Sequence, residues 1–289
     1  MSIKTQKEAY FLYRPCFELN PFEDGVIYFG RDVLLDRLEK YVKLSWRQDK
    51  GLKLVLEGSW GFGKTHTLSH IAVNPRFGNL MEGVYVHLYD LSGKESPYEG
   101  FFWHILKALL RTGHLRQYSK GVRSDRDQAN LLKQTAGLFI YNAIYGLTDP
   151  DTGEIAERWL LGERLTRSDA RGAGLSEGIS DDEARELLAC LGRYFWEVNK
   201  KMLVLLLDEA HRLQQITEDS SYYHMWSTDF KMLLEPRQRL GVMFAMGDRD
   251  RAVTLLEKPE DRSRLGYRWE KIAMFEGPSL AEFLKALIK

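Results

Sequence analysis

The feature that most constrains this chain is a glycine-rich segment between an apolar stretch and a helix-forming one. Residues 58–65 read GSWGFGKT, which satisfies the pattern G-x-x-x-x-G-K-[ST] at every position. The preceding residues 52–57 are short and apolar and predict a buried strand, and a helix is expected over 64–72. In such a unit, backbone N–H groups and a helix N-terminus converge on phosphate oxygens. The sequence therefore predicts a phosphate-binding loop.

Each residue of this loop has an expected role. We expect Lys64 to reach the β- and γ-phosphates of a nucleoside triphosphate and Thr65 to coordinate Mg²⁺. The alternative, a glycine turn that binds no ligand, is disfavoured by the Lys-Thr pair in register. The residues expected to contact the nucleotide are Gly58, Ser59, Trp60, Gly61, Phe62, Gly63, Lys64, Thr65 and His66.

A second motif lies far downstream, where residues 202–209 read MLVLLLDE. An apolar strand that delivers two carboxylates at its C-terminal end is the Walker B arrangement. We expect Asp208 to hold the water shell of the magnesium ion, and Glu209 to orient or deprotonate the attacking water. Apolar runs ending in an acid are common, but the upstream loop favours the functional interpretation. Together the motifs predict ATP and Mg²⁺ as ligands, with hydrolysis.

Composition excludes several classes of protein. The 289 residues include 41 Lys and Arg against 41 Asp and Glu, so the formal net charge is zero and a globally polycationic surface is excluded. Two cysteines exclude a disulfide framework. The N-terminal stretch lacks the apolar core of a signal peptide, and we find no apolar run of membrane-spanning length. We expect a cytoplasmic protein with no membrane partner.

Apolar stretches alternate with helical patterns along the chain. Further strands are expected over 84–88, 203–207, 241–246 and 271–275. This alternation predicts a three-layer α/β fold with a mainly parallel five-stranded sheet. Lys64 and Asp208 are 144 residues apart, which predicts a helical insertion at about 111–200, between strands two and three.

The order of these motifs resembles that of AAA+ ATPases of the initiator-like, origin-recognition branch. The shared features are the box Tyr28-Phe29-Gly30-Arg31-Asp32, the phosphate loop, the Asp-Glu pair and a following strand. The N-terminal segment 1–25, punctuated by Pro15 and Pro21, is expected to be irregular. The resemblance implies an ATPase core over 26–278 and a vestigial or truncated lid helix over 279–289. It also implies an adenine pocket formed by Val26, Ile27 and Tyr28.

Two further boxes carry the resemblance downstream. Asp248 occupies the sensor position, where the family usually has Asn, Ser or Thr, and a carboxylate beside phosphates disfavours efficient hydrolysis. Arg264, or else Arg262, matches the arginine finger that acts on the nucleotide of a neighbouring subunit, which implies an oligomer. Surface arginines in a charged loop are the alternative interpretation.

Features of the insertion and of the phosphate loop point to a particular subgroup of this family. The chain resembles the ATP-binding proteins of BREX phage-defence systems, and transposition-regulator ATPases are a near alternative. The segments that carry this resemblance are residues 158–165, the acidic pair at 181–182 and the Gly-Lys-Thr-His run at 63–66. The resemblance implies a protein that assembles on DNA or with partner proteins to load or regulate a defence, replication or transposition machine. The alternative function is a nucleotide-gated protein-interaction switch with little or no ATPase activity.

Residues 111–126 form a candidate DNA-binding segment, with five Lys and Arg residues against one acid. They are expected to contact DNA phosphates without sequence preference, and Tyr118 either stacks on a base or anchors the loop. Solvated loop charges are an equal alternative, and Arg164, Arg167 and Arg171 offer a second cluster. No other zinc ligands stand at a suitable spacing beside His66 and His70, so we interpret these two histidines as packing residues of a helix.

Overall fold

The computed structural model describes residues 28, 30–88, 97–210, 239–247 and 268–273 of the chain. Their strands form a five-stranded sheet in the order β2-β3-β4-β1-β5. The strands are β1 (Lys53–Glu57), β2 (Met81–His87), β3 (Met202–Asp208), β4 (Leu240–Met246) and β5 (Arg268–Lys271). Every neighbouring pair is parallel. The predicted α/β fold with a mainly parallel five-stranded sheet is therefore confirmed.

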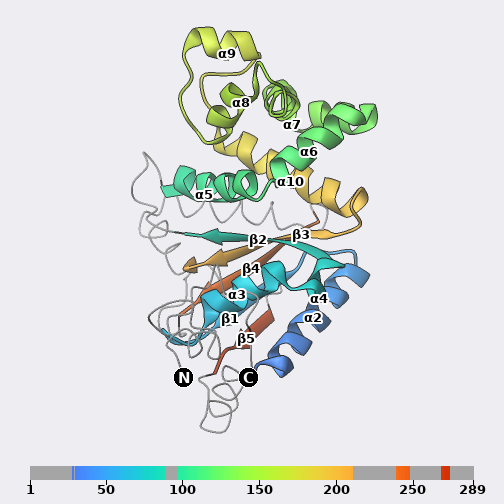
Figure 1. Ribbon diagram of the computed structural model, residues 1–289, viewed down its shortest axis with the longest axis vertical. Helices are drawn as coiled ribbons and strands as arrows, with labels where there is room; N and C mark the ends of the chain where they lie inside the picture. The colour runs from blue at the N-terminus through green and yellow to red at the C-terminus, as the bar shows by residue number, and fades with distance from the viewer. Residues whose placement is uncertain (1–27, 29, 89–96, 211–238, 248–267, 274–289) are drawn as a thin grey trace, which may run out of the picture.

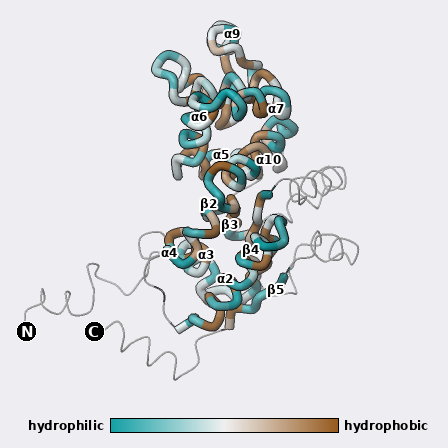
Figure 2. Tube along the Cα trace, turned by 90° about the vertical axis from the view of Figure 1, so that its right-hand side faces the viewer, coloured by the Kyte–Doolittle hydropathy of each residue, from teal (hydrophilic) through white to brown (hydrophobic). Residues whose placement is uncertain are grey.

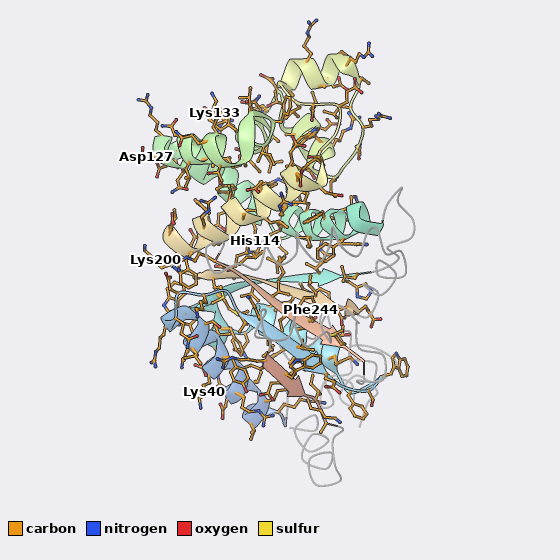
Figure 3. All side chains as sticks on the ribbon, turned by 180° about the vertical axis from the view of Figure 1, so that it is seen from behind. Lys40, His114, Asp127, Lys133, Lys200 and Phe244 are labelled. Atoms are coloured by element: carbon orange, nitrogen blue, oxygen red, sulfur yellow. The ribbon has the colours of Figure 1, made fainter. Side chains whose placement is uncertain are left out.

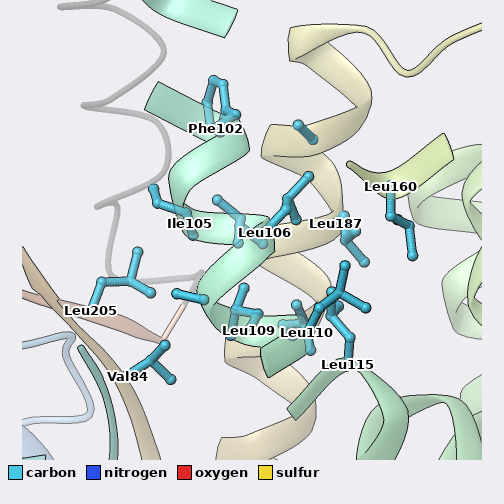
Figure 4. Packing of buried hydrophobic residues seen from close by; sticks show 14 of the residues in the cluster. Val84, Phe102, Ile105, Leu106, Leu109, Leu110, Leu115, Leu160, Leu187 and Leu205 are labelled. Carbon is cyan, nitrogen blue, oxygen red and sulfur yellow. The ribbon is translucent and has the colours of Figure 1, made fainter. Parts of the chain in front are cut away.

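Helices cover both faces of the sheet (Figure 1). One face carries α2 (Asp32–Arg47), α3 (Lys64–Val73) and α4 (Pro75–Gly78), and the other carries α5 (Pro97–Arg111) and α10 (Asp181–Glu197). The strands supply two cores because their side chains alternate between the faces. Leu205 and Val84 pack toward α5 and α10 (Figure 4), whereas Leu206 belongs to the core on the α3 side.

The chain between β2 and β3 contains α5, α10 and four more helices. These are α6 (His114–Ser124), α7 (Arg126–Gly146), α8 (Gly153–Leu160) and α9 (Arg167–Ala173). They stack beyond α5 and α10, and Figure 2 shows long hydrophilic stretches on α6 and α7. Their shared core includes Trp159, which is fully buried. A backbone break at Gly137 divides α7 into two segments.

The structure corrects several details of the sequence interpretation. Residues 114–124 form a helix rather than a charged loop, because apolar residues at helical spacing face inward. Tyr118 is one of them; it is 2% exposed and packs 4.8 Å from the Tyr194 ring, so stacking on a base is wrong. The fifth strand spans Arg268–Lys271 rather than 271–275.

Other predictions fall outside the described residues. These include the segment 1–25, the pocket residues Val26 and Ile27, the sensor residue Asp248, the candidate finger residues Arg262 and Arg264, and the lid helix 279–289. Within the described part of the chain, none of the helices is both long and apolar enough to cross a membrane.

Candidate functional site

The phosphate-loop sequence lies between the end of β1 and the start of α3, as predicted. β1 ends at Glu57, and α3 begins at Lys64 with Gly63 as its N-cap. Gly63 has φ of +80°, a left-handed conformation that side-chain-bearing residues rarely adopt. The glycine at this position therefore lets the chain turn directly from the loop into the helix, whose N-terminus is the end that favours anions.

Two cationic side chains brace the loop from either side. Lys64 Nζ donates hydrogen bonds to the carbonyl oxygens of Gly58 and Ser59, at 2.7 and 3.0 Å. Arg31 Nη2 donates to the Phe62 carbonyl oxygen at 2.6 Å. Arg31 belongs to the Tyr28–Asp32 box, and no role was predicted for it; its contact ties the segment before α2 to the loop.

Asp208 ends β3 and is 1% exposed. Tyr85 donates a hydrogen bond from its hydroxyl to Asp208 Oδ2 at 2.6 Å, and His87 Nδ1 lies 3.7 Å from the same oxygen. Asp208 Oδ1 accepts from the Glu209 N–H at 3.0 Å, and the Thr65 side chain lies close enough to Asp208 to lower its pKa. Tyr85 and His87 come from the neighbouring strand β2 and were not predicted as site residues.

The polar groups around Asp208 decide its charge. Burial by itself raises the pKa of a carboxyl, but the nearby His87, Tyr85 and Thr65 side chains and the Glu209 backbone N–H together outweigh burial and lower the pKa of Asp208. Asp208 is consequently a carboxylate at neutral pH. A buried anion facing the start of α3 is suited to hold a cation there.

Glu209 follows directly and is half-buried. Its φ of +57° is uncommon for a residue with a side chain. Such conformations cost free energy and persist where the surroundings impose them. Here the bond from the Glu209 N–H to Asp208 helps to impose it, so the two acids form one geometric unit.

The residues present fit a magnesium ion that arrives with a nucleotide. Thr65 and Asp208 bring a hydroxyl and a carboxylate oxygen together, and these are ligands that Mg²⁺ accepts. Among the described residues, no group of three or more His, Cys, Asp or Glu side chains is placed to bind a metal. The remaining ligands of such an ion would come from phosphates and water.

Tyr28 lies against α3. Its ring stacks on His70 with centroids 4.3 Å apart and on His66 at 5.7 Å, and its hydroxyl lies 2.9 Å from Thr67 Oγ1. His70 is 7% exposed and hydrogen-bonds to Asn74. This agrees with the interpretation of the two histidines as packing residues, and it places Tyr28 beside the helix that begins at the loop.

Two arginines of the predicted DNA-binding segment form ion pairs with acids from other parts of the chain. Arg116 pairs with Glu157, and Arg123 pairs with Asp149 at 3.3 Å. These acids come from outside residues 111–126, so a count within the segment overestimates its positive charge. Figure 3 shows Lys133 with other charged side chains on the outer helices.

Comparisons with known proteins complete the description. No family model matches the chain. No curated protein matches it either. Among solved structures, the chain is similar to the Orc1 protein of Aeropyrum pernix in complex with DNA, at 16% sequence identity and a TM-score of 0.45. The match covers 90% of this chain and 50% of that one, so this chain spans about half the length of the protein it matches.

Proposed function

We propose that this chain binds ATP with Mg²⁺ at residues 58–65 and hydrolyses it. The observation that carries the proposal is that the buried Asp208 carboxylate lies beside the start of α3, close enough to the Thr65 side chain for Thr65 to lower its pKa. This proximity joins the two motifs that the chemistry requires side by side, although they are far apart in the sequence. A glycine turn without a ligand would not need a buried, ionised carboxylate at its helix end.

Each residue of the site has a role in this proposal. Lys64, now bonded to loop carbonyls, would exchange those bonds for phosphate oxygens. Thr65 and Asp208 would hold the magnesium ion, which when bound neutralises phosphate charge. Glu209 would orient the attacking water and accept its proton. The other loop residues would donate backbone N–H groups to the phosphates.

Three variants test binding and hydrolysis separately. We expect Lys64→Ala to weaken binding of a fluorescent ATP analogue at least about 100-fold, because a charge-assisted contact is lost. Glu209→Gln should keep binding but lower phosphate release at least about 100-fold. Glu163→Gln is the matched control, since this exposed carboxylate pairs with Arg158 in the insertion; it should change neither quantity.

The possible outcomes separate the two functions. If the wild-type chain does not bind nucleotide, the proposal is wrong. If it binds but releases no phosphate with or without DNA, the nucleotide-gated switch replaces the ATPase. If Glu209→Gln hydrolyses at the wild-type rate, Glu209 is not the base.

We further propose an AAA+ type of assembly, with Arg264 or Arg262 acting on the nucleotide of a neighbouring copy, Asp248 as sensor, and Val26, Ile27 and Tyr28 around the adenine. The support is the order of the sequence boxes. ATPase activity per molecule should then rise with protein concentration, and Arg264→Ala should remove that rise. Particle mass with an ATP analogue and DNA tests the assembly directly.

The proposed setting is a DNA-associated defence, replication or transposition machine. Its support is the sequence resemblance together with the exposed Lys120 and Arg126 at the outer helices. Binding of a labelled duplex should weaken as salt increases. Lys120→Ala should reduce the slope of that dependence by about one counterion. No binding at low salt would exclude the DNA part alone.

A further inference from the structure

We propose that Tyr85 is a positioning residue for the Asp208–Glu209 pair, fixing the carboxylate that holds magnesium and, through it, the backbone of the general base. This inference rests on the proposed function. It assigns a role in that function to a strand that lies outside both sequence motifs.

The sheet register brings Tyr85 to the site. In the parallel pairing of β2 with β3, Tyr85 lies opposite Leu206 and His87 lies opposite Asp208. Side chains two residues apart on a strand share a face, so Tyr85 and Asp208 both point toward the α3 side of the sheet. The Tyr85 side chain is 7% exposed within the core on that side, and its packing leaves the hydroxyl aimed at the carboxylate.

The two oxygens of Asp208 are held by different partners. Oδ2 accepts from the Tyr85 hydroxyl at 2.6 Å, and Oδ1 accepts from the Glu209 N–H at 3.0 Å. The carboxylate cannot rotate about its Cβ–Cγ bond without lengthening one of these bonds. Tyr85 therefore fixes the orientation of the group that Thr65 also contacts.

The same bond reaches Glu209. Its left-handed conformation, φ +57°, persists because its surroundings impose it, and Asp208 Oδ1 is one of those restraints. If Asp208 rotates, Glu209 loses that restraint. A single hydroxyl on β2 thus acts on both halves of the catalytic pair.

His87 extends the arrangement. Its Nδ1 lies 3.4 Å from the Tyr85 hydroxyl and 3.7 Å from Asp208 Oδ2. Because the Tyr85 hydroxyl donates to Asp208, its oxygen remains able to accept from a protonated ring nitrogen. This contact is longer than the Tyr85 bond, which makes Tyr85 the residue to test first.

A purely structural role for the hydroxyl has a different consequence. β2 is held to β3 by backbone pairing over seven residues, and the aromatic ring would remain in Tyr85→Phe. Loss of the hydroxyl should therefore leave the fold intact. Partners that orient metal ligands typically contribute about 10- to 100-fold in metal affinity or activity.

The experiment compares Tyr85→Phe with Tyr41→Phe. Tyr41 donates an equally short hydrogen bond, 2.6 Å, to the buried carboxylate Glu270 of β5, at the opposite edge of the sheet from β2. For both variants we would measure the affinity for a fluorescent ATP analogue in EDTA and across a Mg²⁺ titration. Phosphate release would give kcat and KM, and thermal melting would check the fold.

For Tyr85→Phe we expect unchanged affinity in EDTA and about a tenfold higher half-saturating Mg²⁺ concentration. We also expect a kcat about 10- to 100-fold lower at saturating Mg²⁺, with little change in KM. Tyr41→Phe should match the wild type in all of these while losing comparable thermal stability.

The outcomes are distinguishable. If the wild type fails to bind nucleotide, the proposed function falls and this inference falls with it. If the wild type binds with a Mg²⁺ dependence that Tyr85→Phe shares, only the positioning role is overturned. Equal losses in EDTA and in Mg²⁺, or the same Mg²⁺ shift in Tyr41→Phe, would show a merely structural hydroxyl. If the wild type binds without hydrolysing, the Mg²⁺ titration alone decides.

Discussion

The sheet and the helices between β2 and β3 bury different kinds of side chain. These helices, α5–α10, are called the insertion below. Among the described residues, the buried Asp and Glu side chains are Glu57, Asp208 and Glu270, and all three belong to strands. The described insertion buries apolar residues together with two uncharged or weakly basic ones, His104 and Ser119. Acids are almost never buried without a partner or a purpose, so the sheet is the part of the described chain that holds carboxyl groups in its interior.

The insertion keeps its charges outside. Its ion pairs, such as Arg116 with Glu157 and Arg158 with Glu163, are partly exposed, and such pairs contribute about 0–1 kcal/mol each. Its stability must therefore come from apolar packing of the kind shown in Figure 4. We infer that substitutions in the insertion should change stability first and nucleotide binding little.

Two tryptophans give the largest test of this difference. Trp159 is fully buried in the insertion, whereas Trp60 is 95% exposed in the phosphate loop. Trp159→Ala should lower the unfolding free energy by about 3–5 kcal/mol, because it leaves a large cavity. Trp60→Ala should lower it by less than about 0.5 kcal/mol. Urea denaturation monitored by circular dichroism measures both values.

Nucleotide affinity of the folded fraction gives the second half of that test. Trp159→Ala should bind the ATP analogue like the wild type once the unfolded fraction is subtracted. A large loss of intrinsic affinity would show that the insertion shapes the site, and the separation of roles would be wrong.

Two buried strand carboxylates sharpen the comparison within the sheet. Asp208 accepts from Tyr85, and Glu270 accepts from Tyr41 and pairs with Arg37 at 3.0 Å. Asp208→Asn and Glu270→Gln should each cost about 1–3 kcal/mol of stability, because buried polar partners are left imperfectly satisfied. Only Asp208→Asn should also weaken Mg²⁺-dependent nucleotide binding.

Calorimetric titration with Mg·ATP analogue and denaturation of both variants would check this pair. Equal effects on binding would mean that neither carboxylate is specific to the site. An unaffected Asp208→Asn would remove Asp208 from the proposed metal site.

The parts of the site that the sequence predicts are those that depend on contiguous residues. The loop at 58–65 is one backbone conformation, set by glycines and the helix that follows, so its pattern can be read directly. β3 is similar, because a fully buried strand is a continuous apolar run. These local signals placed the loop, the Asp-Glu pair and the first four strands along the chain.

Contacts that depend on register were not predictable. Tyr85 and Asp208 are 123 residues apart, and only the pairing of β2 with β3 brings them together. Helix α6 was missed because its charges and Gly121 resemble a loop. In the structure, a Cβ atom at Gly121 would lie 2.3 Å from the Tyr194 hydroxyl, so that glycine permits close packing.

A smaller effect is expected at the start of α10. Ser180 caps this helix in a capping box with Glu183, each side chain accepting from the other residue's backbone N–H. Ser180→Ala should lower stability by about 1 kcal/mol, measured as a shift in the denaturation midpoint. Thr152, at the N-cap of α8 without a side-chain cap bond, supplies the control. A larger loss for Thr152→Ala would contradict the assignment.

The smallest expected effect is a pH dependence that originates in the insertion. His114 begins α6 and packs against Phe195, and burial lowers its pKa below the usual value of about 6.5, although Glu82 at 4.0 Å opposes the shift. The unfolded chain therefore takes up this proton first. Stability should be greatest above pH 6.5 and fall as the pH decreases toward the lower pKa of the folded state.

Denaturation at pH 7.5, 6.5 and 5.5 would isolate this contribution. His114→Gln should flatten the decrease over that range, because the unfolded state no longer gains a proton there. Glu82→Gln should steepen the decrease in stability, because it removes the negative charge that favours protonated His114. Glu82 also pairs with Lys201 at 2.7 Å, but Lys201 stays charged throughout this pH range. If His114→Gln keeps the full decrease, another group causes it. The pH sensitivity would then not belong to the insertion.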